Sequence, residues 1–368
     1  MVTIYKSDTI TPFQLILLAM TCIGLKNHVF AISPLISSAG RDAWITVIIT
    51  MVLTFIWVLL IFFVHKKTNN QPLMEWLSQT IGNKATNFVI LLFVLYLLFM
   101  CGISLRETMS WTKIAYLPET PTWILTIMFL FICWYLAKES MQTLNRINIF
   151  LLFFIIIFGF FVATANIKFK NHSLLLPMLE HGIRPVLNGI IFQASGMVEI
   201  FIFLLLQHKL NNPLKFRHFS ITILLLTGLT LGPLIGALIE FGPREATIQR
   251  FPPFEEWALV SIGNFVEHVD FLSIYQWLSG VFIRISLLLF LIKELLPSSI
   301  QRKNLILFLF LFIIAFIVIV PISDFQFNYY LRTYILPTTF CFFFSFSILI
   351  SALVAIQTLR KRRTSNEV

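Results

Sequence analysis

Long apolar runs separated by short polar connections fill this chain from Ile10 to Ala355. Charged residues are confined almost wholly to the connections. A hydrocarbon core about 30 Å thick requires about 20 apolar residues of helix to cross it, and these runs have that length. The pattern predicts an all-α integral membrane protein with about ten transmembrane helices, near residues 10–34, 43–64, 87–111, 122–137, 147–166, 186–207, 218–240, 271–292, 305–321 and 332–357.

Three other segments have distinct patterns. Between Pro72 and Ile81 the apolar residues fall at helical spacing, which predicts a short helix lying in the membrane interface. The connection 242–270 is long and acidic, and a helix over Trp257 to Val266 is expected to cap the outer face. Residues 358–368 form a basic tail, which we expect to be cytoplasmic.

Composition supports a membrane protein and argues against catalysis. Hydrophobic residues make up 58% of the chain and charged residues 12%, against about 25% charged residues in a soluble domain. The four cysteines lie in apolar runs without metal-binding spacing, so we expect neither disulfides nor a metal site. Phosphate-binding loops and the common hydrolase motifs are missing from the sequence. We therefore expect no enzymatic activity and no cofactor.

The positive charge of the chain follows the expected topology. With the N-terminus in the cytoplasm, about twice as many Lys and Arg residues lie in the inner connections as in the outer ones. This bias predicts that both termini are cytoplasmic. The tail Arg360 to Arg363 then contacts anionic membrane lipid, and nucleic acid is not expected as a partner.

Glu199 is a carboxylate in the middle of the sixth predicted span. An ionised group at that depth costs at least about 2.5 kcal/mol unless it is paired, hydrated or protonated. Ser195 and Gly196 precede it and can loosen the helix, as in transporters that bind substrate at broken helices. A protonated Glu199 bonded to a neighbouring helix is the structural alternative.

The first span has a matching polar interruption at residues 24–28. Spans one and six are the first members of two halves of five spans, so their interruptions occupy corresponding positions. This order predicts one transmembrane domain over 1–368, built as an inverted repeat with halves at about 10–166 and 186–357. Two alternatives stay open, because Lys26 can extend to the surface and His28 can be a hydrogen-bonded core residue.

Two further arginines lie within predicted spans. Arg284 is halfway through span eight, and a bidentate contact with Glu199 would relieve the cost of burying both groups. Glu199 could instead serve Lys26 or the ammonium group of a ligand. Arg106 is late in span three, where anchoring of the helix competes with ligand binding. The candidate ligand-binding residues are Gly24, Leu25, Lys26, Asn27, His28, Arg106, Ser195, Gly196, Glu199 and Arg284.

Several stretches together resemble a known family. They are Ala39-Gly40-Arg41-Asp42-Ala43-Trp44-Ile45, the approach to span six at 176–189, Gly196-x-x-Glu199, the segment 265–270 and the basic tail. On these residues the whole chain is similar to the B subunit of bacterial spore germinant receptors, within the amino acid–polyamine–organocation transporter superfamily.

The resemblance implies a LeuT-like fold of five plus five spans with helices one and six broken. It also implies residence in the spore inner membrane, complex formation with a germinant receptor A subunit and a lipoprotein C subunit, and sensing of a small nutrient such as an amino acid. The family usually has a Gly-x-Gly turn in span one. Here Gly24 is followed by Leu25 and Lys26, so Lys26 either binds a ligand carboxylate or fills the site as an internal cation.

Three functions share this pattern. A receptor would bind its ligand between spans one, three, six and eight and shift a conformational equilibrium. A secondary transporter would use the same site, with Glu199 or Lys26 changing protonation. An ion-conducting pore is the third function, and fold alone does not separate them.

Overall fold

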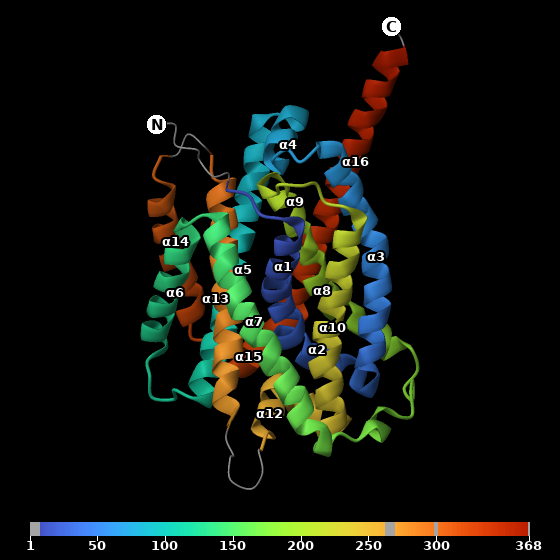
Figure 1. The fold of residues 1–368 in the computed structure, drawn as a ribbon, viewed down its shortest axis with the longest axis vertical. Helices are drawn as coiled ribbons and strands as arrows, with labels where there is room; N and C mark the ends of the chain where they lie inside the picture. Colours follow the sequence, from blue (N-terminus) through green and yellow to red (C-terminus); the bar gives the residue numbers. More distant parts are fainter. Residues whose placement is uncertain (1–7, 262–268, 298–300, 367–368) are drawn as a thin grey trace.

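The computed structural model describes residues 8–261, 269–297 and 301–366, with side chains up to Arg360. Helices dominate this part of the chain, and its β-structure is an isolated bridge between Ile10 and Leu210. The helices lie roughly side by side in one bundle, and both chain ends are at the same end of it (Figure 1). The predicted all-α class is confirmed.

The α-helices of the first half are α1 (Pro12–Leu25), α2 (Ile32–Ala39), α3 (Ala43–Thr68), α4 (Leu73–Ile81), α5 (Asn83–Ala115), α6 (Thr122–Lys138) and α7 (Met141–Ala165). Those that follow are α8 (Arg184–Met197), α9 (Ile202–Leu206), α10 (Phe216–Phe241), α11 (Pro243–Ile248), α12 (Pro252–Ala258), α13 (Leu272–Leu295), α14 (Lys303–Ile319), α15 (Asp324–Tyr330) and α16 (Leu336–Asn366).

Shorter helical turns join several of these. Two are π-helical, namely η1 (Lys26–Phe30) and η8 (Leu331–Ile335). The others are 3-10 turns, namely η2 (Gly40–Asp42), η3 (Asn166–Phe169), η4 (His172–Leu175), η5 (Val198–Phe201), η6 (Gln207–Lys209) and η7 (Val269–Phe271).

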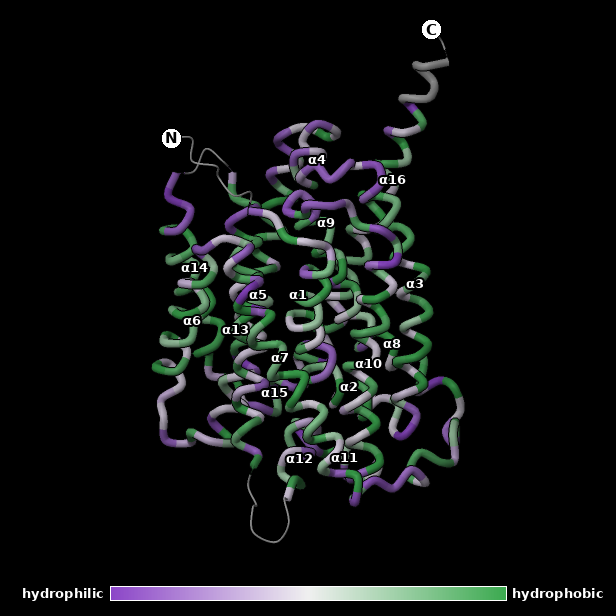
Figure 2. The backbone as a smooth tube through the Cα atoms, viewed as in Figure 1, coloured by the Kyte–Doolittle hydropathy of each residue, from purple (hydrophilic) through white to green (hydrophobic). Residues whose placement is uncertain are grey.

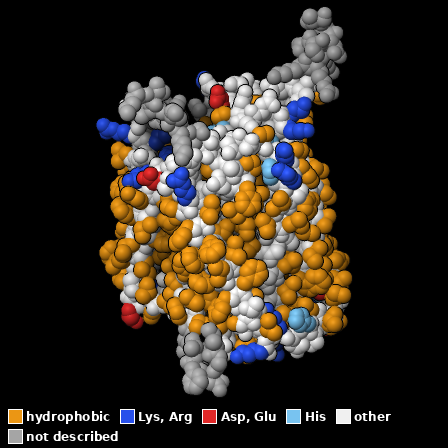
Figure 3. Space-filling view, viewed as in Figure 1, with side chains coloured by type: hydrophobic (Ala, Val, Ile, Leu, Met, Phe, Trp, Pro, Cys, Tyr) orange, Lys and Arg blue, Asp and Glu red, His pale blue; other side chains and the backbone are white. Residues whose placement is uncertain are grey.

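The bundle has the surface of a multi-pass membrane protein. Within the described ranges, seven helical stretches are long and apolar enough to cross a membrane, and α6 and α14 are shorter apolar helices. Helix α13 has 24 residues and carries Arg284, Lys293 and Glu294. Hydrophobic side chains cover the middle of the bundle, while Lys and Arg gather toward its two ends (Figure 3). The tube in Figure 2 likewise shows hydrophilic connections at both ends.

Each of the ten predicted ranges overlaps a helix, although the number that cross the membrane and the inverted repeat remain predictions. The short helix predicted after Pro72 is α4, which buries Leu73, Trp76 and Leu77. The helix expected over 257–266 differs from what is found. Helix α12 begins earlier, with prolines at its first turn, and ends at Ala258. The second half of that expected helix, from residue 262, and residues 265–268 of the segment 265–270 lie outside the described residues.

Two boundaries differ from expectation for physical reasons. The first span continues past its polar turn into α2 and stops only at Gly40, which has a φ of 57° that favours glycine. The last helix does not end before the basic tail, because α16 continues to Asn366. Arg and Lys are good helix formers, so charge at this point moves the chain out of the apolar layer without ending the helix.

The bundle encloses two of its helices more than the others. In the stretch from α1 through η1, 78% of the apolar segment is buried inside the protein. The corresponding share is 89% for the stretch from α8 to η6 and 17% for α7 and η3. Helix α1 packs against α13, α10 and α7, and α8 packs against α3, α2 and α16. The interrupted parts of these two helices are therefore held in the interior of the protein.

Candidate functional site

The site lies where the polar turns of the first and sixth spans meet. In the first span, α1 changes to the π-turn η1 at Lys26, and in the sixth, α8 changes to the 3-10 turn η5 at Val198. Neither helix is unwound into extended backbone, so each predicted break is a change of helical pitch. The helices touch closely, because a Cβ added to Gly196 would lie 1.5 Å from Asn27 Oδ1.

A three-residue ion cluster occupies this meeting point. Lys26 Nζ lies 3.0 Å from Glu199 Oε1. Arg284 on α13 donates from Nη1 to Glu199 Oε2 at 2.7 Å and from Nη2 to Oε1 at 2.9 Å. The three residues are 1%, 2% and 0% exposed. With all three ionised, the cluster carries one net positive charge among buried side chains.

Backbone and hydroxyl groups accept further hydrogen bonds from the two cations. Lys26 Nζ also donates to the Ser195 carbonyl at 3.0 Å. Arg284 donates to the Cys22 carbonyl at 2.6 Å and from Nε to Ser104 Oγ at 3.0 Å. Arg284 therefore links α13 to α1, η5 and α5. Buried charges with this many partners hold the four elements in one arrangement.

Two buried amide oxygens on the interrupted helices have no hydrogen-bond donor among the described residues. They are Oδ1 of Asn27 and Oε1 of Gln193, and both side chains are 0% exposed. Gln193 lies one turn before Gly196 on α8, and its amide nitrogen donates to Thr230 Oγ1 at 3.1 Å. A buried acceptor without a donor costs about 1–3 kcal/mol. The site thus combines surplus positive charge with unused acceptors.

The remaining predicted residues of the first span have packing and local contacts. Gly24 faces Leu229 of α10, where a Cβ would lie 3.1 Å from the leucine side chain. Leu25 packs against Gly280 of α13. His28 bonds through Nδ1 to the carbonyl of Gly24, one turn earlier. These residues set how closely α1 approaches α10 and α13, and they lie beside the ion cluster.

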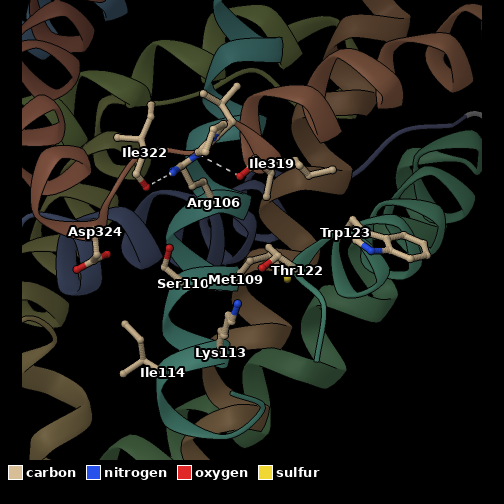
Figure 4. A pocket seen from close by; sticks show the side chains of 13 residues that line it. Arg106, Met109, Ser110, Lys113, Ile114, Thr122, Trp123, Ile319, Ile322 and Asp324 are labelled. Atoms are coloured by element: carbon tan, nitrogen blue, oxygen red, sulfur yellow. Dashed lines mark hydrogen bonds between the residues drawn. The ribbon is translucent and has the colours of Figure 1, made fainter. Parts of the chain in front are cut away.

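Arg106 is not part of the cluster. Its guanidinium donates to the carbonyl of Val318 in the last turn of α14, at 3.0 Å, and to those of Val320 and Ile322 just beyond the helix, both at 2.7 Å. These contacts satisfy carbonyls left free at a helix C-terminus. Figure 4 shows Arg106 directed toward this segment. Of the two uses considered for Arg106, the geometry supports anchoring.

A second ion network lies one helical turn along α5 from Ser104. Arg250 donates to both oxygens of Glu107, at 2.8 and 2.6 Å, and to Asp324 Oδ2 at 2.9 Å. Burial works to lower the pKa of Arg250, but the two carboxylates outweigh it and hold that pKa above its usual value. Glu107 itself is 1% exposed. This clamp joins α5, α15 and the connection before α12.

Aromatic layers close the cluster on both sides along α5. On the side of the clamp, Trp111 stacks on Trp277 at 4.3 Å between ring centroids. On the other side, Phe93 stacks on Phe201 at 5.8 Å, and Phe346 contacts Phe93 at 4.8 Å. The ion cluster is thus enclosed, with the Trp111–Trp277 stack and the Arg250 clamp on one side of it along α5.

Breaking the clamp is expected to expose the cluster. In Arg250→Gln, Glu107 loses its bidentate partner, so separation of α5 from α15 becomes easier. The native thiol of Cys22, 3.7 Å from Arg284 Nη1, is a reporter. We expect its reaction with a small methanethiosulfonate, which forms a mixed disulfide and releases methanesulfinate, to accelerate at least about tenfold, the factor for about 1.4 kcal/mol. Arg244→Gln on α11, an exposed site, is the control. Equal rates in both variants would contradict the role of the clamp.

Sequence reasoning missed four contributors to the site. Ser104, Gln193 and Thr230 are neutral polar residues inside apolar runs, and a search for intramembrane charge passes over them. A search for buried amides and hydroxyls would have selected them, although it would also have selected many Ser and Thr that bond their own helix. The Cys22 carbonyl has no sequence signal, because backbone groups are present at every position.

Comparison with known proteins identifies the family of this chain. Residues 9–327 match the family model described as "Spore germination protein". The chain is 41% identical to "Spore germination protein XB" of Bacillus anthracis, over 95% of this chain and 99% of that protein. It is 28% identical to "Putative spore germination protein YfkT" of Bacillus subtilis over 76% of this chain and 77% of the relative, and 21% identical to "Spore germination protein KB" of the same species over 73% of each. The chain belongs to the spore germination protein family of receptor and permease type.

Proposed function

We propose that this membrane protein is the nutrient-sensing B subunit of a spore germinant receptor. The ion cluster of Lys26, Glu199 and Arg284 is its recognition site, and binding there triggers germination. The observation that carries the proposal is a buried cluster of two basic groups and one carboxylate, enclosed between the pitch changes of two central helices. An ionic arrangement of this kind inside the apolar layer is costly to maintain, which favours a role in ligand recognition beyond that of holding the helices together.

The unused hydrogen-bonding capacity defines the ligand class. An ammonium has three donors and a guanidinium five. Among the described residues, the contacts of Lys26 and Arg284 leave donors for one more anionic group. Asn27 Oδ1 and Gln193 Oε1 are unused acceptors. A ligand with a carboxylate and an ammonium group close together satisfies both sets, and an α-amino acid is the simplest such molecule.

Signalling follows from the enclosure of the site. A ligand shifts the population of two conformations only by its difference in affinity between them. Entry past the Arg250 clamp and accommodation beside Gly196 favour a state with α5, α15 and η1 displaced. The A subunit and the lipoprotein C subunit, the partners we propose, then read this displacement in the spore inner membrane, with both termini of this chain in the cytoplasm.

Nutrient screening of spores tests this function. Spores lacking the gene should lose germination in response to one or a few α-amino acids. The amide of the same amino acid, which lacks the carboxylate, should be inactive on spores with the gene. Loss of response to a sugar or a nucleoside alone would contradict the proposed ligand class, and unchanged germination with every nutrient would contradict the sensing role.

Transport of the same ligand is the second candidate function, because the enclosed site is compatible with it. Aromatic layers on both sides of a central site suit alternating access as well as sensing. The protein alone in vesicles distinguishes the two. Uptake of the labelled amino acid against its gradient would assign transport, whereas binding without uptake would assign sensing.

A further inference from the structure

A pocket of about 460 Å³ lies at the clamp end of the bundle, apart from the ion cluster. The ends of α5 and α14, the start of α6 and Asp324 of α15 line it. Figure 4 shows Arg106 and Lys113 on the same side of α5, with Trp123 at the edge of the group. Neither recognition of an amino acid nor the clamp accounts for this pocket.

Its polar lining is cationic and incompletely used. Arg106 is 7% exposed, yet its Nε–H has no acceptor among the described residues. Asp324 also lines the pocket, but its carboxylate is held by Arg250. The charges of Arg106 and Arg250 balance those of Glu107 and Asp324, so the cation left over at the pocket is Lys113.

Lys113 is placed to share an anion with Arg106. The two residues are seven positions apart, which is about 10.5 Å along a helix and two turns on the same face. Side chains lean toward the N-terminus of their helix, so the Lys113 ammonium extends back toward Arg106, as Figure 4 shows. Within the described ranges, Lys113 has neither an ion pair nor a hydrogen bond.

Exposed apolar side chains form the rim of the pocket on the outer surface of the bundle. Ile114 is 64% exposed, Trp123 54% and Ile319 45%. Tryptophan is enriched where a membrane protein meets the headgroup layer. A free anion gains nothing from this rim, whereas a lipid places its phosphate at the cations and its chains along the exposed apolar side chains.

We propose that this pocket binds the phosphate of an anionic phospholipid from the membrane leaflet at the clamp end of the bundle. Lys113 and the Nε–H of Arg106 hold the phosphate, and Ile114, Trp123 and Ile319 contact the acyl chains. The bound lipid lies between α5, α6 and α14. It therefore joins three helices, of which α5 also carries the clamp residue Glu107.

Thermal unfolding of the purified full chain in neutral detergent tests the site. Phosphatidylglycerol, diacylglycerol and inorganic phosphate are added separately to the wild type and to three variants. For the wild type, phosphatidylglycerol should raise the unfolding midpoint, and the other two should not. In Lys113→Gln the lipid concentration for half the effect should rise about tenfold. Lys113→Arg should retain the wild-type response. Lys84→Gln, an exposed lysine near the other end of α5, should also retain it.

The outcomes separate the lipid from other occupants. An equal midpoint shift from inorganic phosphate would show a free-anion site and overturn the lipid assignment. An equal shift from diacylglycerol would show apolar contact alone and overturn the phosphate contacts. Equal loss in Lys113→Gln and Lys84→Gln would show general surface charge and overturn the pocket. Lys113 is exposed and makes no contact on which folding depends, so these variants are expected to fold.

Discussion

Replacing Glu199 with Gln is expected to destabilise the protein by about 3–5 kcal/mol, the usual cost of removing one partner from a buried ion pair. The amide keeps the shape of the side chain but not its charge. Lys26 and Arg284, which are 1% and 0% exposed, would then face each other without an anion. We expect a lower yield of folded protein in membranes, a lower unfolding midpoint in detergent and loss of the nutrient response.

Two comparisons make the Glu199 experiment specific. Glu75→Gln changes an exposed residue on α4 and should leave both stability and response near wild type. Adding Lys26→Met to Glu199→Gln removes one of the two unpaired cations, so the double variant should be more stable than Glu199→Gln alone. Additive losses in the double variant would mean that Lys26 and Glu199 do not interact, because contacting charges give non-additive effects.

Gly196→Ala is expected to disturb the site through sterics alone. The new Cβ would lie 1.5 Å from Asn27 Oδ1 and 2.7 Å from Asn27 Cγ, so the buried Asn27 side chain has to move or η1 and α8 have to separate. Overpacking of this kind costs about 1–3 kcal/mol. The separation also moves Lys26 away from the Ser195 carbonyl. We expect a lower unfolding midpoint and a weaker nutrient response.

Another glycine and a compensating change provide the controls. Gly228 of α10 has nothing within 4 Å of an added Cβ, so Gly228→Ala should be neutral or stabilising by up to about 1 kcal/mol from helix propensity. Asn27→Ala combined with Gly196→Ala removes the clash and should restore much of the stability. Equal effects of Gly196→Ala and Gly228→Ala would show that the close approach at Asn27 does not hold the two helices together.

The fold was predictable to the extent that hydropathy determines it. Membrane thickness sets the helix length, so every predicted span range overlaps a helix. Hydropathy does not show how a polar turn is accommodated. At Lys26 and Val198 the backbone keeps helical hydrogen bonding with an altered pitch, because inside an apolar layer a freed amide or carbonyl needs a partner.

The candidate site was predictable residue by residue but not as a set of contacts. Lys26, Glu199 and Arg284 were each selected because an ionised side chain inside the apolar layer carries a high free-energy cost. Their positions along the chain did not show which of them is the partner of Glu199. The structure shows that Glu199 contacts both cations. Arg106 had the same sequence signal, but its partners are carbonyls at the end of α14. Those carbonyls are more than 200 residues away in the sequence, as the separation of 212 for Val318 shows, and helical periodicity does not reveal them.

The most direct test of the recognition site is the dose response of spores carrying Lys26→Met. Glu199 keeps its two contacts with Arg284, at 2.7 and 2.9 Å, so the variant should fold and reach the membrane at wild-type levels. For the amino acid identified by gene deletion, we predict that the half-maximal concentration rises at least about tenfold, the effect of losing one charged hydrogen bond to the ligand. Lys84→Met, at an exposed site on α5, should respond like wild type. An unchanged dose response in Lys26→Met, with equal protein in the membrane, would contradict a ligand site at this ion cluster.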